Sequence, residues 1–196
     1  QHHGGPTRLI DFSTSLLVAA FFAIETTEGD AAIWALRNEA FIHQSLKRRP
    51  DVRLKRIDEL TRAANNEFDQ LVGRGEVVQL VLPVEPEQLH QRLWLQQGLF
   101  VAQMDLNRSF VENLSPTFCT PTEPMPLEPV EIGWQDIIKS YHLTGVNSEL
   151  PIGLVRIVLP QEIHHQIRED LAAANISAAT LFPGLDGLAR SLKFRI

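Results

Sequence analysis

The chain has 196 residues, of which 44% are apolar and 21% charged; 18 lysines and arginines against 24 aspartates and glutamates give a net charge of −6. This length corresponds to one domain, and the acidic balance argues against a globally basic nucleic-acid-binding protein. No apolar run approaches the roughly 20 residues that span a bilayer, so we expect no membrane contact. The single cysteine, Cys119, cannot form an internal disulfide, which indicates a reducing compartment and a cytoplasmic location.

The N-terminal region predicts a loop, a strand and a helix. The chain opens inside what reads as structured sequence and without a methionine, so we expect a segment to precede it. Residues 1–6, with two glycines and a proline, predict a loop that enters an extended piece over residues 7–12. Three hydroxyl residues at 13–15 then precede the apolar run Leu16–Ile24, and a hydroxyl can accept a free backbone N–H at a helix start. Since this helix is apolar nearly all round, we expect it to be buried against a sheet that contains Gly98–Val101.

Periodicity, glycine and proline predict the remaining elements. We expect strands at residues 31–36, 76–82, 98–103 and 153–159, helices at residues 54–71, 86–95, 134–141 and 161–174, an irregular loop at 116–129, and a final turn and helix at 181–189. Strands and helices are mixed without a regular βαβ repeat. The fold class is therefore α+β, with one domain over residues 1–196 and a mixed, mostly antiparallel sheet packed by helices.

Polar residues near the N-terminus form the densest candidate site. Arg8 offers a planar guanidinium suited to phosphate or carboxylate. Asp11 can pair with Arg8 or hold a ribose hydroxyl, and the hydroxyls at 13–15 stand at a helix start, where free N–H groups favour an anion. The same residues also have a purely structural interpretation, in which an Arg8–Asp11 ion pair fixes a loop in front of a capped core helix.

Other candidate sites are weaker. Segment 47–56 holds six lysines and arginines and is either a solvated helix face or a contact surface for a phosphate-bearing partner, a protein or a nucleic acid. His164 and His165 are adjacent and point to different faces, and no cluster of His, Cys and Asp has the spacing of a metal site, so no metal is expected. Cys119 has no evident base near it and is not expected to act as a nucleophile.

Three separated motifs resemble the FRG domain family. The first, QHHGGPTRLIDF at residues 1–12 with LVAAFFA at 17–23, is similar to the family's QHxGxPTRLLDWT and LVALYFA. RLWLQQGLF at residues 92–100 is similar to R-x-x-x-QQG-x-F, and LFPGLDGLA at residues 181–189 to LFPxLDGLA. The motifs stand in the family's order and span nearly the whole chain. The (F/Y)RG motif that names the family is absent, and Phe12 and Ser13 stand where Trp and Thr are usual.

The family's layout in turn resembles the Arg–Ser–Glu group of ADP-ribosyltransferases, which implies an ADP-ribosyltransferase-like fold. Those enzymes place an Arg on a first strand, a Ser-Thr-Ser strand end before a buried helix, and a catalytic Glu on a later strand. Residues 12–15 are similar to the second element, residues 96–98 lie roughly where the third falls, and the first would lie upstream. A glutamine at the position of the Glu can bond a ribose hydroxyl, but it supplies no negative charge to an oxocarbenium-like transition state.

The resemblance implies an NAD-dependent ADP-ribosyltransferase or NAD glycohydrolase of a bacterial defence or toxin type. Its catalytic residues would be Arg8, Asp11 and Gln97, with Asp11 supplying the charge that Gln97 lacks. NAD would be the co-substrate, and the residues expected to bind it are Gln1, His2, Arg8, Ser13, Thr14 and Gln96.

The alternative is a non-catalytic module of the same fold that senses a nucleotide or binds a protein. A shared site requires Arg8 and Asp11 to lie in one cavity that also reaches Gln96 or Gln97. An equally open interpretation of the two glutamines is that they only satisfy backbone groups at a sheet edge.

Overall fold

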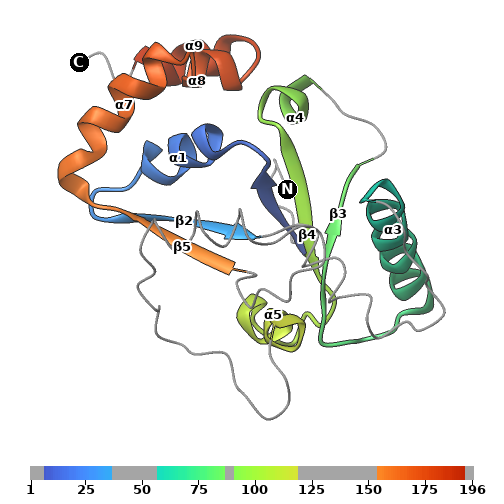
Figure 1. Ribbon diagram of the computed structural model, residues 1–196. Helices are drawn as coiled ribbons and strands as arrows, with labels where there is room; N and C mark the ends of the chain where they lie inside the picture. Colours follow the sequence, from blue (N-terminus) through green and yellow to red (C-terminus); the bar gives the residue numbers. More distant parts are fainter. Residues whose placement is uncertain (1–6, 37–56, 87–90, 119–153, 193–196) are drawn as a thin grey trace.

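The computed structural model describes residues 7–36, 57–86, 91–118 and 154–192 (Figure 1). In chain order its elements are β1 (Leu9–Ser13), α1 (Leu16–Glu25), β2 (Ala31–Leu36), α3 (Ile57–Arg74), β3 (Val81–Val84), α4 (Gln91–Leu95), β4 (Gly98–Gln103), α5 (Phe110–Phe118), β5 (Leu154–Leu159), the 3-10 helix η1 (Gln161–Ile163), α7 (His164–Ala173), α8 (Ala178–Leu181) and α9 (Leu185–Leu192). Helices and antiparallel strands are mixed along the chain, which confirms the α+β prediction.

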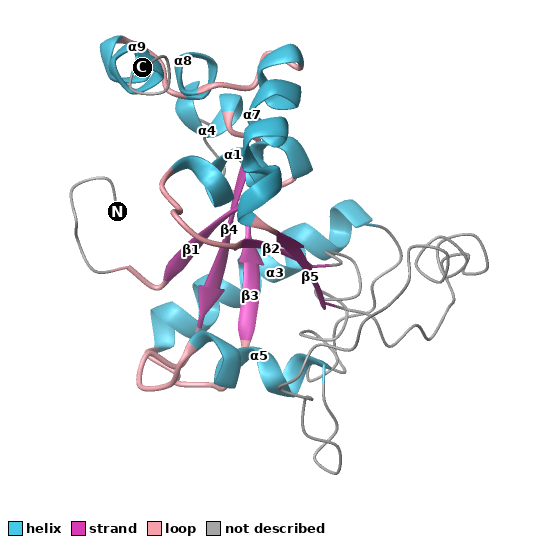
Figure 2. Ribbon diagram, turned by 90° about the vertical axis from the view of Figure 1, so that its left-hand side faces the viewer, coloured by secondary structure: helices cyan, strands magenta, loops and turns pink. Residues whose placement is uncertain are grey.

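The described strands form two sheets rather than the single sheet expected. One sheet has the order β1–β4–β3 and the other pairs β2 with β5, as Figure 2 shows, and each of these pairings is antiparallel. In the first sheet Leu9 lies opposite Ala102 and Ser13 opposite Gly98. Each sheet therefore joins an early strand to a strand made much later in the chain.

Helix α1 begins where the hydroxyl residues predicted. Ser15 is its N-cap, and the Ser15 Oγ accepts a hydrogen bond from the Val18 backbone N–H at 3.4 Å. Val18, Phe21 and Ile24 are buried in a core that also contains residues of β2, β5, α7 and α8. Figure 1 shows α1 lying between the β2–β5 sheet and α7.

The expectations for the packing of α1 are corrected in two respects. The helix packs on the β2–β5 sheet and α7, not on Gly98–Val101, because the residues of β4 pack into separate clusters with α3 and α5. Burial on every face is also wrong, since Leu16, Leu17 and Phe22 are 58%, 46% and 39% exposed. An apolar side chain on the surface is common in proteins and needs no special compensation.

Helices α3 and α5 contribute to the two clusters of the three-stranded sheet. Leu71 of α3 packs with Leu82 and Ala102, whereas Leu114 of α5 packs with Val81 and Val101. Neighbouring residues of a strand point to opposite faces, so these clusters lie on opposite sides of the sheet. The sheet that carries the candidate site residues of β1 and β4 thus packs against helices on both faces.

Elements β3 and α5 differ from the sequence prediction, and helix α8 was also not expected. The strand expected over 76–82 begins at Val81 and includes Pro83, which is tolerated because β3 is an edge strand of the described sheet. Helix α5 was not expected, and its C-terminal part falls in the predicted loop 116–129. The helix expected over 134–141 lies outside the described residues. Within the described part of the chain, no helix is long and apolar enough to cross a membrane.

Candidate functional site

The end of β1 meets the start of β4 through the residues that the sequence singled out. The Thr14 backbone N–H donates to the Gln97 carbonyl at 2.9 Å, and the Thr14 hydroxyl donates to the same oxygen at 3.3 Å. The Ser13 hydroxyl donates to the Gln96 carbonyl at 2.8 Å and accepts from the Ser15 backbone N–H at 3.1 Å. The hydroxyls expected to hold a ligand therefore bond the backbone of the glutamine pair.

The third motif reaches the same place. The Gln96 side-chain amide donates to the Leu181 carbonyl at 3.2 Å, and the Arg92 guanidinium lies 4.7 Å from the centre of the Phe182 ring. We call the set Ser13, Thr14, Gln96, Gln97 and Phe182 the motif junction. The structure thus brings parts of all three sequence motifs together at one point.

Phe182 lies in the centre of several ring contacts. Its side chain is 3% exposed, the Phe22 ring meets it edge-on at 5.9 Å, and the Arg190 guanidinium lies 4.2 Å from its centre. Arg190 in turn pairs with Glu25, with its Nη1 3.5 Å from Oε1. These contacts connect α1 and α9 to the motif junction.

Gln97 turns the chain from α4 into β4. Its φ of 46° lies in the left-handed region, and its backbone N–H donates to the Trp94 carbonyl at 3.1 Å. Non-glycine residues adopt this conformation at a cost of about 1–3 kcal/mol, so the surrounding contacts must hold it. A Cβ at the following Gly98 would overlap the Leu93 side chain, so the turn is closely packed. The Gln97 side chain itself is exposed.

Arg8 lies away from the glutamines. The Gln103 backbone N–H donates to the Arg8 carbonyl at 3.2 Å, which places Arg8 at the far end of the β1–β4 pair. Six residues of extended strand separate Gln97 from Gln103, a distance of about 20 Å. The expectation that Arg8 shares a cavity with Gln96 or Gln97 is therefore wrong, because β1 carries Arg8 away from the junction.

Asp11 lies between these two ends. It stands in the middle of β1, opposite Phe100, and is exposed. Asp11 and Ser13 are two residues apart on one strand, so they share a face of the sheet. Asp11 is therefore the candidate carboxylate that the strand geometry places nearest to the motif junction.

A shallow recess lies at the far end of β1. Its volume is about 220 Å³, and its walls are formed by Arg8, Leu71, Val72, Gly75, Glu76, Val77, Met104, Leu106 and Asn107. Ligand pockets usually enclose about 300–1,000 Å³, so this recess is small for a dinucleotide. Its carboxylate, Glu76, lies 3.5 Å from the Arg74 guanidinium.

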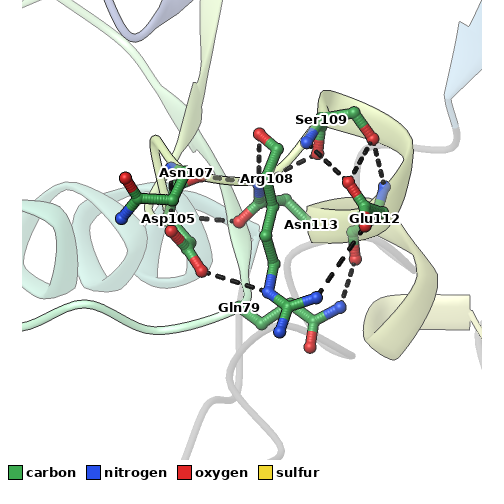
Figure 3. A network of polar contacts seen from close by, with 7 residues as sticks. All are labelled: Gln79, Asp105, Asn107, Arg108, Ser109, Glu112 and Asn113. Atoms are coloured by element: carbon green, nitrogen blue, oxygen red, sulfur yellow. Dashed lines mark hydrogen bonds and ion pairs between the residues drawn. The ribbon is translucent and has the colours of Figure 1, made fainter.

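A polar network follows β4 at the same end (Figure 3). Asn113 is fully buried, and its side-chain amide nitrogen donates to the Asp105 carbonyl at 2.9 Å and to the Ser109 carbonyl at 3.0 Å. Its Oδ1 accepts from the Asp105 backbone N–H at 3.1 Å. Arg108 closes the turn, with its Nε 3.2 Å from the Asp105 carboxylate.

Ser109 and Glu112 form a capping box at the start of α5. The Ser109 backbone N–H and hydroxyl both donate to Glu112 Oε2 at 2.8 Å, and the Glu112 backbone N–H donates to the Ser109 Oγ at 3.3 Å. The hydrogen bonds from Ser109, aided by Arg108, hold the pKa of Glu112 below its ordinary value of 4.5. The network bonds its own backbone, which indicates a structural role.

The other candidates add no residue to the junction. Gln1, His2, Cys119 and the basic segment 47–56 lie outside the described residues. His164 is buried with its Nε2 3.0 Å from the Leu159 carbonyl, whereas His165 is exposed. Sequence reasoning gave no role to Arg92 or Phe182, although both stand inside the second and third motifs.

The FRG domain model matches residues 1–32, which confirms the resemblance to that family over this part of the chain. Comparison with curated proteins and with solved structures found no match. The matched residues include β1 and α1, and with them Ser13 and Thr14 of the motif junction.

Proposed function

We propose that this chain, whose first 32 residues match the FRG domain, binds NAD and releases nicotinamide from it, either to transfer ADP-ribose or to hydrolyse NAD. The observation that carries the proposal is the pairing of Thr14 with Gln97. Enzymes of the Arg–Ser–Glu type have a Ser-Thr-Ser strand end before a buried helix and a catalytic Glu on a later strand, and here the residues similar to these two elements are hydrogen-bonded neighbours. A bacterial defence or toxin protein of the cytoplasm fits this activity.

The proposed chemistry divides between two side chains. Gln97, exposed at the strand start, donates to or accepts from a ribose hydroxyl. Asp11 provides negative charge as the bond between C1′ of the ribose and the nicotinamide nitrogen breaks, with the electron pair leaving on nicotinamide. Water or an acceptor nucleophile then attacks C1′ and releases its proton to the solvent. Ser13 and Gln96 position the two strands, because their side chains already bond main-chain carbonyls.

The variant Gln97→Glu tests the proposal. The change is nearly isosteric and returns a negative charge to the position of the family's glutamate, so nicotinamide release should rise by about 10- to 100-fold. Gln103→Glu makes the same change at the far end of β4 and should leave release at the wild-type rate. Release that stays unchanged or falls in Gln97→Glu would contradict the proposal.

A second candidate is a non-catalytic module that binds a nucleotide without breaking it. Two observations favour it: Gln97 is an amide, and the Ser13 hydroxyl and Gln96 amide are engaged by backbone carbonyls. Calorimetry with NAD distinguishes the candidates when it is paired with measured nicotinamide release. In the enzyme, Asp11→Asn lowers turnover far more than NAD affinity, whereas a module binds NAD with no release in the wild type or in Gln97→Glu.

A further inference from the structure

Arg92 carries an unsatisfied donor at the motif junction. Among the described residues, its Nε is the buried side-chain nitrogen or oxygen that lacks a hydrogen-bond partner. A buried polar atom without a partner destabilises the fold, and more strongly when the group is charged. Native structures keep few such atoms, so this one calls for an explanation.

Three other described arginines are arranged differently. Arg190 pairs with Glu25, Arg108 with Asp105 and Arg74 with Glu76. Within the described part of the chain, the contact found for the Arg92 guanidinium is the Phe182 ring at 4.7 Å. That ring attracts the cation, but it is only a weak hydrogen-bond acceptor for N–H groups.

The position of Arg92 connects it to Gln96, the residue before Gln97. The Gln96 backbone N–H donates to the Arg92 carbonyl at 3.0 Å, so Gln96, directly after α4, lies one helical turn beyond Arg92. Residues four apart share a helix face. Both side chains accordingly reach the same segment, since Gln96 bonds the Leu181 carbonyl and Arg92 covers the next residue, Phe182.

We infer that Arg92 binds the diphosphate of the dinucleotide whose nicotinamide ribose lies at Gln97; this inference rests on the proposed function. A guanidinium presents a fork of N–H donors that matches two phosphate oxygens. Contact with the buried Phe182 ring restricts the guanidinium before the ligand arrives, which lowers the entropy lost on binding. Glu25 neutralises Arg190 on the same ring, so among the described residues of this cluster Arg92 is the cation without a carboxylate partner.

The test compares ligands with and without a diphosphate on the full-length protein. Arg92→Gln should weaken the binding of NAD and of ADP by about 10- to 150-fold in calorimetry, and it should leave the affinity for nicotinamide riboside unchanged. Arg190→Gln, which removes a guanidinium from the same ring, should change NAD affinity by less than about threefold, because that cation already has a carboxylate partner. Arg92→Lys keeps the charge without the planar fork and should recover part of the lost affinity.

The outcomes separate this inference from the proposed function. ADP binding that depends on Arg92 supports the inference even if nicotinamide is never released. The absence of nicotinamide release would contradict the proposed enzymatic activity only. The inference would be overturned if Arg92→Gln and Arg190→Gln lost the same NAD affinity. It would also be overturned if Arg92→Gln weakened the binding of nicotinamide riboside as much as that of NAD. Neither result would contradict NAD binding itself. Failure of the wild type to bind NAD, ADP or inorganic pyrophosphate would overturn both. Thermal melts check that each variant is folded. If Arg92→Gln does not fold, the same affinities are compared between Arg92→Lys and the wild type.

Discussion

The two ends of β4 are stabilised in opposite ways. At its start, Ser13, Thr14 and Leu181 supply hydrogen bonds across 83 to 85 residues of chain. Beyond its other end, the buried Asn113 bonds Asp105 across eight residues, and the capping box spans three. The hydrogen bonds of the first end form only when distant segments have assembled. Beyond the second end, where Gln103 still pairs with Arg8, the bonds among residues 105–113 can form from one short stretch.

This difference between the two ends of β4 indicates which end can bind a ligand. The short-range network uses its polar atoms on its own backbone, so it offers little to a partner. The motif junction leaves the Gln97 side chain exposed and the Arg92 Nε without a bond among the described residues. Segments that meet from far apart position such groups accurately, because each segment is fixed by its own helix or strand. The junction is therefore the end at which function is expected.

The largest effect on folding stability is expected for Gly187→Ala, which disturbs the packing beside the motif junction. A Cβ at Gly187 would overlap the Phe182 carbonyl and lie 2.7 Å from the Ala178 carbonyl, and neither backbone oxygen can move easily. We expect the free energy of unfolding to fall by about 3 kcal/mol in urea titrations. Gly73→Ala in α3, where a Cβ meets nothing within 4 Å, should instead raise it by about 0.5–1 kcal/mol. A Gly187→Ala protein as stable as the wild type would show that α8 and α9 are not tightly joined.

A smaller loss of folding stability is expected for Asn113→Ala, which lies in the short-range network beyond the end of β4. The change leaves the Asp105 backbone N–H and carbonyl without their side-chain partner in a buried place, which should cost about 2–3 kcal/mol. Asn107→Ala, at an exposed asparagine of the same turn, should alter stability by no more than about 0.5 kcal/mol. Calorimetry should find NAD affinity unchanged in both folded variants. A loss of NAD affinity in Asn113→Ala would mean that the two ends are coupled.

The smallest effect is a pH dependence from the capping box. Because the folded pKa of Glu112 lies below its ordinary value of 4.5, the carboxylate stabilises the fold above that value, and this contribution disappears as the pH falls through the folded pKa. The difference in urea midpoint between the wild type and Glu112→Gln should therefore be largest at neutral pH and vanish in acid. Ser109→Ala removes the hydroxyl bond to Glu112 but keeps the backbone N–H bond, which is the larger cause of the lowered pKa, so it should reduce this pH dependence only in part. A difference that persists unchanged below pH 4.5 would contradict the assignment.

Features that depend on neighbouring residues were predictable from the sequence. The hydroxyl before α1 and the strands at 31–36 and 98–103 follow from local patterns. Arg8 shows the limit of such patterns. Arg8 is only five residues from Ser13 in the sequence. Because each residue of extended strand adds about 3.3 Å, the two residues nevertheless lie at opposite ends of the β1–β4 pair.

Features that depend on which segments meet were not predictable. The apolar run 16–24 carries no information about which sheet it will cover, and the outcome was the β2–β5 pair rather than β4. Arg92 and Phe182 stand 90 residues apart, and only the assembled fold shows that one stacks on the other. The sequence motifs identified the segments that form the motif junction, but the contacts among these segments are seen only in the tertiary structure.

The pairing of early strands with late ones also has a consequence during synthesis on the ribosome. Strand β2 ends at residue 36, and its partner β5 begins at residue 154. At a translation rate of roughly 5–20 residues per second, β2 waits roughly 6–25 s for that partner to be made. Throughout this interval the apolar residues of α1 lack the surface that covers them in the finished protein, and a chaperone that binds short apolar helices would protect the nascent chain.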